Sequence, residues 1–208
     1  MMLLLPLVGM LLFVAFYLVA VFDYPGGSYI SPNAVGFSFR NNYLCDLLDT
    51  YAVNGEHNPA RWYSRIALFV LCSSLILLWY HLPGLFNSKG LGLTVMRFSG
   101  MVALAIPFFL RNGNHDTVLR IAGIFGTLAL IIAFVQLFWA RLYILFSMGV
   151  LCLFIFLVNY YIYETGTFIE VLPVIQKITF LGFIGWFVFL NIQIYKQLKS
   201  IENEEGLE

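Results

Sequence analysis

The sequence predicts an all-α polytopic membrane protein, with six transmembrane helices in a bundle and one structured extracytoplasmic loop. Three observations lead to this class. Of the 208 residues, 61% are hydrophobic and 11% are charged, whereas about a quarter of an ordinary soluble domain is charged. The mean hydropathy is +0.88. Six apolar stretches also reach the roughly 20 residues that a helix needs to cross the hydrocarbon core.

The predicted spans follow one another with clear breaks between most of them. Turn-forming residues such as Pro83-Gly84 and Asn112-Gly113 separate the apolar stretches. The first span is expected to be a mature helix, because it lacks a basic leading segment and a small-x-small cleavage site. We expect one domain over residues 1–199 and an acidic tail over residues 200–208. The spans are predicted at about 2–22, 66–86, 91–110, 117–139, 142–163 and 171–194.

Six crossings place both termini on one side of the cell membrane. Lys196 and Lys199 follow the last span, while the connection before it carries Glu164 and Glu170 and no basic residue. Because cytoplasmic segments are enriched in Lys and Arg, this asymmetry favours cytoplasmic termini. Nucleic acid is excluded as a partner, because eleven basic residues are balanced by eleven acidic ones.

The interiors of the spans carry small residues rather than charges. Gly100, Gly126 and Gly149 predict close helix packing. No Asp or Glu lies near the middle of a span, which disfavours a small transporter. Arg97 and Lys177 each lie about two turns inside a span and are expected to extend their charge to the interface. A half-buried ion pair of Lys177 is the open alternative.

The connection over residues 23–65 is the longest one and is rich in aromatic and leucine residues, so we expect it to be folded. Its apolar residues recur at near-helical spacing, which predicts a short amphipathic helix at the interface, capped by Asn41 or Asn42. The residues that set this spacing are Tyr43, Leu44, Leu47, Leu48 and Tyr51.

Titratable residues on one membrane face form the candidate site. Connections after the first, third and fifth spans share a face, so the long loop is on the side of the turn before the fourth span. Taken singly, each residue has a structural interpretation, for example Asp116 as a helix-start carboxylate paired with Arg120. Together, a histidine and several carboxylates suit general acid–base chemistry or a divalent metal. The residues are Asp46, Asp49, His57, His115 and Asp116. No metal-specific spacing and no cofactor motif accompanies them, so the metal is unknown and no cofactor is predicted.

The segment Asn42-Tyr43-Leu44-Cys45-Asp46-Leu47 resembles the N-x-[IL]-S-D-[LT] element that follows the first span in the prokaryotic membrane family DUF998. That family is distantly similar to the Frag/DRAM/Sfk group. The resemblance implies six helices, a large first outer loop and a histidine at the start of the fourth span, matched here by His115. Cys45 stands where the family has serine. The eukaryotic group implies lipid-related roles, including remodelling of glycolipid anchors.

These features favour a membrane protein that binds lipids, or modifies lipid headgroups, at the extracytoplasmic face. Membrane lipids are the expected partners, and whether the protein is an enzyme is left open. The first alternative is a non-catalytic membrane subunit or scaffold that packs against partner helices or forms a homo-oligomer. The second is a small transporter.

Overall fold

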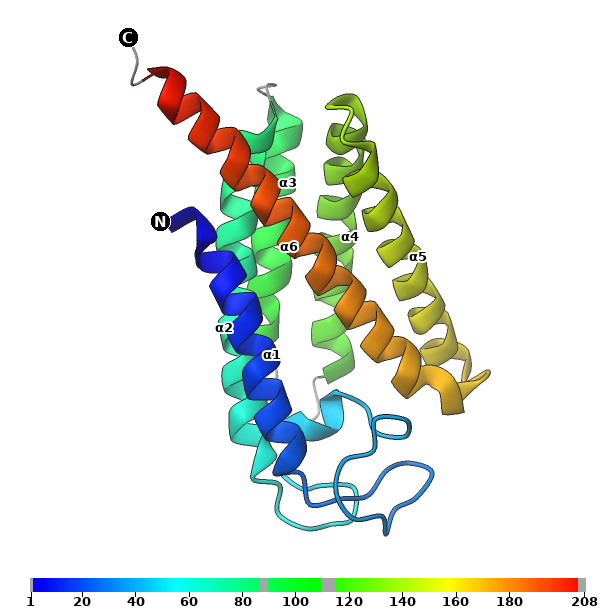
Figure 1. Ribbon diagram of the computed structural model, residues 1–208. Coiled ribbons are helices and arrows are strands. Elements are labelled where there is room, and N and C mark those ends of the chain that lie inside the picture. Colours follow the sequence, from blue (N-terminus) through cyan, green and yellow to red (C-terminus); the bar gives the residue numbers. More distant parts are fainter. Residues whose placement is uncertain (1, 87–89, 110–114, 206–208) are drawn as a thin grey trace. The chain divides into compact units, whose positions relative to one another are not determined.

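The computed structural model describes residues 2–86, 90–109 and 115–205 (Figure 1). The side chains of residues 2, 115, 116, 204 and 205 lie outside that description. Within the described ranges the chain is helical apart from the long loop and short turns, and two isolated β-bridges occur in the loop.

Six α-helices correspond to the six predicted spans, and each is long and apolar enough to cross a membrane together with the adjoining short turns. The all-helical class and the number of candidate spans are therefore confirmed. The helices are α1 (Leu5–Phe22), α2 (Ala60–His81), α3 (Leu91–Ala105), α4 (His115–Trp139), α5 (Tyr143–Thr165) and α6 (Leu172–Glu205). The 3₁₀ turns are η1 (Met2–Leu4), η2 (Cys45–Leu48), η3 (Leu82–Leu85), η4 (Ile106–Phe109) and η5 (Ile169–Val171).

Two helices extend beyond their predicted bounds. Helix α2 begins at Ala60 rather than near residue 66, because the Asn58 side chain accepts a hydrogen bond from the Ala60 backbone N–H at 3.1 Å and starts the helix. Hydropathy did not predict this first part of α2, because it contains Arg61 and Arg65. Helix α6 continues to Glu205, beyond the predicted end near residue 194. The tail expected from residue 200 is therefore helical through Glu205.

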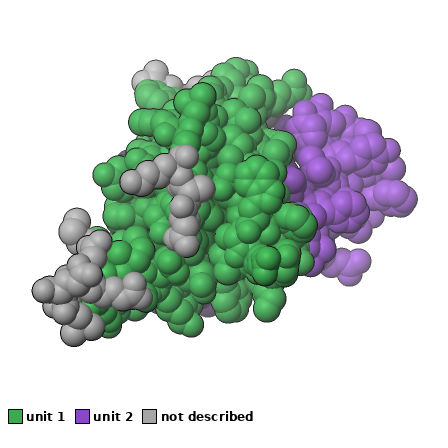
Figure 2. Space-filling model, turned by 90° about the horizontal axis from the view of Figure 1, so that it is seen from above, with its two compact units in different colours: residues 1–10, 69–149, 186–208 green, residues 11–68, 150–185 purple. Residues whose placement is uncertain are grey.

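The chain forms two compact units, coloured separately in Figure 2. The first comprises residues 1–10, 69–149 and 186–208, and the second comprises residues 11–68 and 150–185.

Glycines permit close packing in the first unit. The indole of Trp186 is fully buried and donates a hydrogen bond to the Leu145 carbonyl at 2.8 Å. A Cβ at Gly149 would lie 2.9 Å from the Trp186 ring, and a Cβ at Gly100 would lie 2.3 Å from the Trp79 ring. The predicted packing role is therefore confirmed for both glycines.

The second unit contains the loop and the helix segments that hold it. The rings of Phe13 and Phe180 stack with centroids 6.4 Å apart. Tyr24 and Leu47 of the loop are buried in a small core. The other members of this core are Ala20, Ala52 and Ala60, with Tyr17, Val21 and Phe37 packed against it.

Candidate functional site

The loop is folded, as predicted, although regular secondary structure contributes little to it. Polar side chains form hydrogen bonds with backbone groups of the loop that would be paired with other backbone groups in a strand or helix. Asn42, Asn58 and Ser64 are buried and bond to backbone groups. The Asn58 amide donates to the Asp49 carbonyl at 2.9 Å, and the Ser64 hydroxyl donates to the Leu47 carbonyl at 2.6 Å. Buried polar groups that find partners in this way fix one conformation.

A turn at Gly26-Gly27 forms the base of the loop. Gly27 has a φ of +83°, and a Cβ there would lie 2.4 Å from the Asn54 nitrogen. Its carbonyl accepts a hydrogen bond from the Asn42 side chain at 2.6 Å, and its N–H donates to the Ala34 carbonyl at 2.7 Å. A side chain at Gly27 would therefore disturb the segment that holds Asn42.

The predicted amphipathic helix is wrong: the segment forms only the single 3₁₀ turn Cys45–Leu48. The Asp46 carboxylate accepts a hydrogen bond from the Tyr43 backbone N–H at 2.9 Å, and the backbone becomes extended at Asp49. A side chain that bonds its own preceding backbone competes with helix formation. The predicted cap is also wrong, because the Asn42 side-chain oxygen accepts from the Ser38 backbone N–H instead.

Asp46 lies among polar groups of the loop and of α6, namely the Asn42 side chain, the Tyr43 backbone N–H and the Lys177 ammonium group. One oxygen, Oδ2, accepts from both the Asn42 side chain, at 2.8 Å, and the Tyr43 N–H, while Oδ1 has no hydrogen-bond partner among the described residues. Burial raises the pKa of this carboxyl, and the nearby Asp49 adds to the rise. Its two hydrogen bonds and the charge of Lys177 oppose the shift without cancelling it.

Two neighbouring side chains of α6 reach the same segment of the loop. The Gln176 side-chain oxygen accepts from the Leu44 N–H at 2.8 Å, and its amide nitrogen is 3.4 Å from the Cys45 sulfur. Lys177 Nζ donates to the Asn42 carbonyl at 2.5 Å. It also donates to the Pro173 carbonyl at 2.9 Å and lies 5.5 Å from the centroid of the Phe37 ring.

The Lys177 ammonium group, which the sequence predicts to extend to the interface, reaches the backbone of the loop. The side chain is half-buried and bonds to the loop backbone. It is also close enough to Asp46 to affect the pKa of that carboxyl. The half-buried ion pair left open by the sequence stays a prediction, because the hydrogen bonds of Lys177 among the described residues go to carbonyl groups and its influence on Asp46 is electrostatic.

The predicted site residues fall into three groups. Asp46 and Asp49 lie together at one turn, with Asp49 exposed. His57 is exposed, and its ring meets Tyr51 edge-on with centroids 6.4 Å apart. No interaction joins it to Asp46 among the described residues. His115 and Asp116 lie in the first turn of α4, but their side chains are outside the described part of the structure.

Sequence reasoning missed Asn42 as a hydrogen-bond partner of Asp46, and it missed Gln176 and Lys177 as side chains of α6 that bond to the same segment of the loop. The available signal was the Gln176-Lys177 pair inside an apolar span, where polar side chains are costly and usually have a specific partner.

Neither a metal-binding group among the described residues nor a similar known protein indicates what the site does. Across residues 2–86, 90–109 and 115–205, no three His, Cys, Asp or Glu residues are grouped so as to hold a metal ion. No protein-family model, curated protein or solved structure matches the chain.

Proposed function

We propose that this chain is an integral membrane protein that binds a zwitterionic lipid headgroup at the face that carries the loop. Asp46 and Lys177 are the two polar anchors of the proposed site. The observation that carries the proposal is the half-buried Asp46 carboxylate, held on one oxygen and unbonded on the other, in the electrostatic field of the Lys177 ammonium.

The unused bonding capacity defines what the site would take. An ammonium group has three N–H donors, and Lys177 directs two of them at the carbonyls of Asn42 and Pro173. The third is left for an incoming oxygen, and Oδ1 of Asp46 is left for an incoming donor. A headgroup with one phosphate and one ammonium group, such as phosphoethanolamine, supplies both and matches the opposite charges of the pair.

The pKa of Asp46 extends the proposal from binding to chemistry. Because burial raises it, the carboxyl exchanges its proton closer to neutral pH than an exposed aspartate does. A general acid or base works best when its pKa lies near the working pH. Asp46 is therefore the group that we expect to move a proton if the bound headgroup is modified.

The experiment compares lipid selectivity in nanodiscs of phosphatidylcholine that contain small amounts of phosphatidylethanolamine or phosphatidylglycerol. The lipids retained by the purified protein are counted by native mass spectrometry. We expect the wild type to enrich phosphatidylethanolamine, and Asp46→Asn to lose roughly ten- to hundredfold of this selectivity, because one charge-assisted hydrogen bond contributes roughly 1.5–3 kcal/mol. The matched control is Asp23→Asn, the same change at an exposed residue of the same loop.

Equal retention by Asp46→Asn and the wild type would contradict the proposal, as would an equal loss in Asp23→Asn. A second arm follows headgroup release from labelled phosphatidylethanolamine. Release that disappears in Asp46→Asn supports a lipid-modifying enzyme, whereas binding without release restricts the proposal to lipid binding.

The scaffold alternative has its own observation. Helix α5 carries large apolar side chains that are more than half exposed, including Leu151, Phe154 and Tyr161. Lipid or a partner helix can cover such a face. A single oligomeric state larger than the monomer in mild detergent, lost on Phe154→Ser, would favour the scaffold over a lipid-covered surface.

A further inference from the structure

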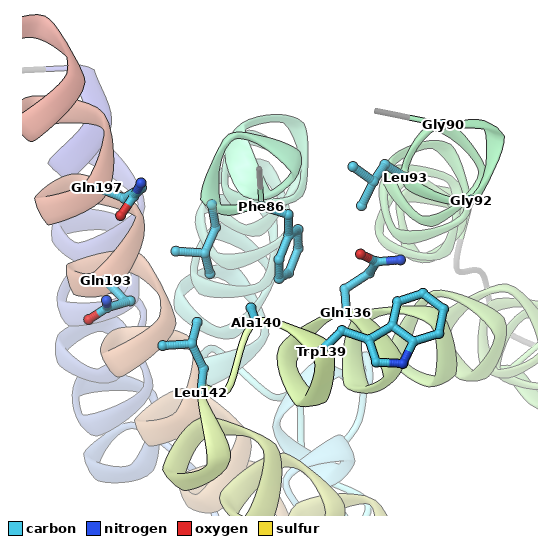
Figure 3. A pocket seen from close by; sticks show the side chains of 11 residues that line it. Phe86, Gly90, Gly92, Leu93, Gln136, Trp139, Ala140, Leu142, Gln193 and Gln197 are labelled. Carbon is cyan, nitrogen blue, oxygen red and sulfur yellow. The ribbon is translucent and has the colours of Figure 1, made fainter. Parts of the chain in front are cut away.

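A cavity of about 620 Å³ lies in the first unit, where α2 gives way to η3, α3 begins, α4 ends and α6 passes (Figure 3). This volume is within the range of small-molecule sites. The residues that line it are Leu85, Phe86, Gly90, Gly92, Leu93, Gln136, Trp139, Ala140, Leu142, Gln193 and Gln197.

The chemistry of the lining is amide and hydrocarbon. Gln136, Gln193 and Gln197 supply the polar side-chain groups, apart from the indole N–H of Trp139, and none of the lining residues is ionisable. Each primary amide offers two N–H donors and a carbonyl acceptor, whatever the pH. Such a lining suits hydroxyl and ester groups. It offers no cation to a phosphate and no anion to an amine.

The amides come from separate elements. Gln193 and Gln197 are four residues apart on α6, so they share one face of the helix. Gln136 extends from α4 beside Leu93 and Trp139 (Figure 3). An amphiphile in the cavity would therefore meet amides from two helices and apolar side chains between them.

The α4–α5 turn gives the cavity a fixed wall. Arg141 has a positive φ of 60°, and the Leu142 N–H donates to the Leu137 carbonyl at 3.0 Å. The Ala140 N–H donates to the Gln136 carbonyl at 2.8 Å. This left-handed residue, followed by backward hydrogen bonds, is a helix-ending motif that satisfies the last carbonyls. It fixes the backbone at the end of α4, next to Trp139 and Leu142.

The position along the spans indicates the depth of the cavity in a membrane. Its lining comes from helix ends, where amphipathic aromatic rings prefer the boundary between headgroups and acyl chains. Trp139 is 70% exposed at this end of α4. In a chain of six crossings, connections alternate between faces, so the α2–α3 and α4–α5 connections share one face of the membrane.

We infer that this cavity is a second lipid site, which takes the uncharged glycerol-ester part of a diacylglycerol-type lipid. The amides of Gln193 and Gln197 bond to the free hydroxyl and the ester carbonyls, and the apolar residues receive the first acyl methylenes. This site is distinct from the headgroup site proposed at the loop, because it lies within the other unit and takes a ligand without charge.

The test measures binding of dioctanoylglycerol, dioctanoyl phosphatidic acid and glycerol to the full chain in mild detergent by native mass spectrometry. The wild type should bind dioctanoylglycerol at least tenfold more tightly than either of the others. Two variants attack the site differently: Gln193→Leu/Gln197→Leu removes two amides, and Gly92→Leu fills space, because a Cβ at Gly92 meets no atom within 4 Å.

The double variant should weaken dioctanoylglycerol binding about tenfold, as the loss of one to two hydrogen bonds predicts. Gly92→Leu should weaken it to a similar extent by occupying part of the cavity. The control Asn203→Leu makes the same kind of change on α6 at an exposed residue outside the lining. Circular dichroism checks that each variant is folded. If the double variant is not folded, Gly92→Leu alone tests the site.

Three outcomes would overturn the inference. Unchanged binding in both folded site variants removes the ligand from this cavity. Preference for phosphatidic acid contradicts the uncharged lining as the basis of selection. Glycerol that binds as tightly as dioctanoylglycerol assigns the cavity to a free polyol instead of a lipid.

Discussion

Replacing Asn42 by alanine should release the loop while leaving the helices intact. The buried side chain accepts from the Ser38 N–H at 2.9 Å and donates to the Gly27 carbonyl at 2.6 Å and to Asp46 Oδ2 at 2.8 Å. Two bonds to neutral groups contribute about 1 kcal/mol each, and one to a carboxylate contributes about 1.5–3 kcal/mol. The expected loss of local stability is therefore about 3.5–5 kcal/mol.

Amide hydrogen exchange in detergent measures this loss directly, because exchange in a locally opening segment tracks its opening free energy. Each 1.4 kcal/mol is a factor of ten, so amides over residues 27–58 should exchange roughly 300- to 4,000-fold faster in Asn42→Ala. Amides of α3 should be unchanged.

The neighbouring residue provides the control. The bond at Asn41 is from its backbone N–H to the Ser38 hydroxyl, and Asn41→Ala keeps it. If the loop amides of Asn42→Ala accelerate by less than tenfold, or if Asn41→Ala accelerates them equally, the Asn42 side chain does not organise the loop and the reasoning is refuted.

Two further predictions concern pH and packing. Because the folded-state pKa of Asp46 is raised, the contribution of this carboxyl to stability is fully present below its unfolded pKa and is lost as the pH rises through the folded value. Loop protection against exchange, corrected for intrinsic rates, should fall across that window in the wild type and less so in Asp46→Asn; equal slopes would contradict the shift. Gly100→Ala should lower the free energy of unfolding by about 1–3 kcal/mol, since the new Cβ would lie 2.3 Å from the Trp79 ring. Thermal unfolding in detergent measures this loss. Gly123→Ala, whose Cβ would meet nothing within 4 Å, should be neutral or stabilising.

The helices could be predicted from the sequence because hydropathy is a local property. A helix that crosses a membrane satisfies its backbone bonds within one segment, so the apolar length alone locates it. The predicted helix ends were wrong where polar or charged side chains, rather than apolar length, set the end of the helix. Asn58 starts α2 in a charged stretch, and α6 continues past Lys196 and Lys199 into polar sequence.

The loop could not be predicted in the same way, because its bonds join residues distant in sequence. Lys177 and Asn42 are 135 residues apart, and Gln176 and Leu44 are 132 apart. The periodicity of the leucines and tyrosines near residue 47 is real, but it reflects burial of Leu47 in the loop core. Local pattern therefore selected Asp46 as a candidate site residue, which stays a prediction, and assigned it the wrong secondary structure.

Most buried polar groups of the loop are hydrogen-bonded, so the two groups at its centre that are not, on Asp46 and Lys177, are notable. Asn42, Asn58 and Ser64 all find hydrogen-bond partners, yet Asp46 Oδ1 and one N–H of Lys177 have no hydrogen-bond partner among the described residues. If these groups form the headgroup site, its selectivity must depend on the order of the loop that holds them. Asn42→Ala should then abolish enrichment of phosphatidylethanolamine in nanodiscs. Binding of dioctanoylglycerol should persist in the same variant, because the glutamine-lined cavity is built within the other unit. A loss of both ligands would mean that the two proposed sites are not independent.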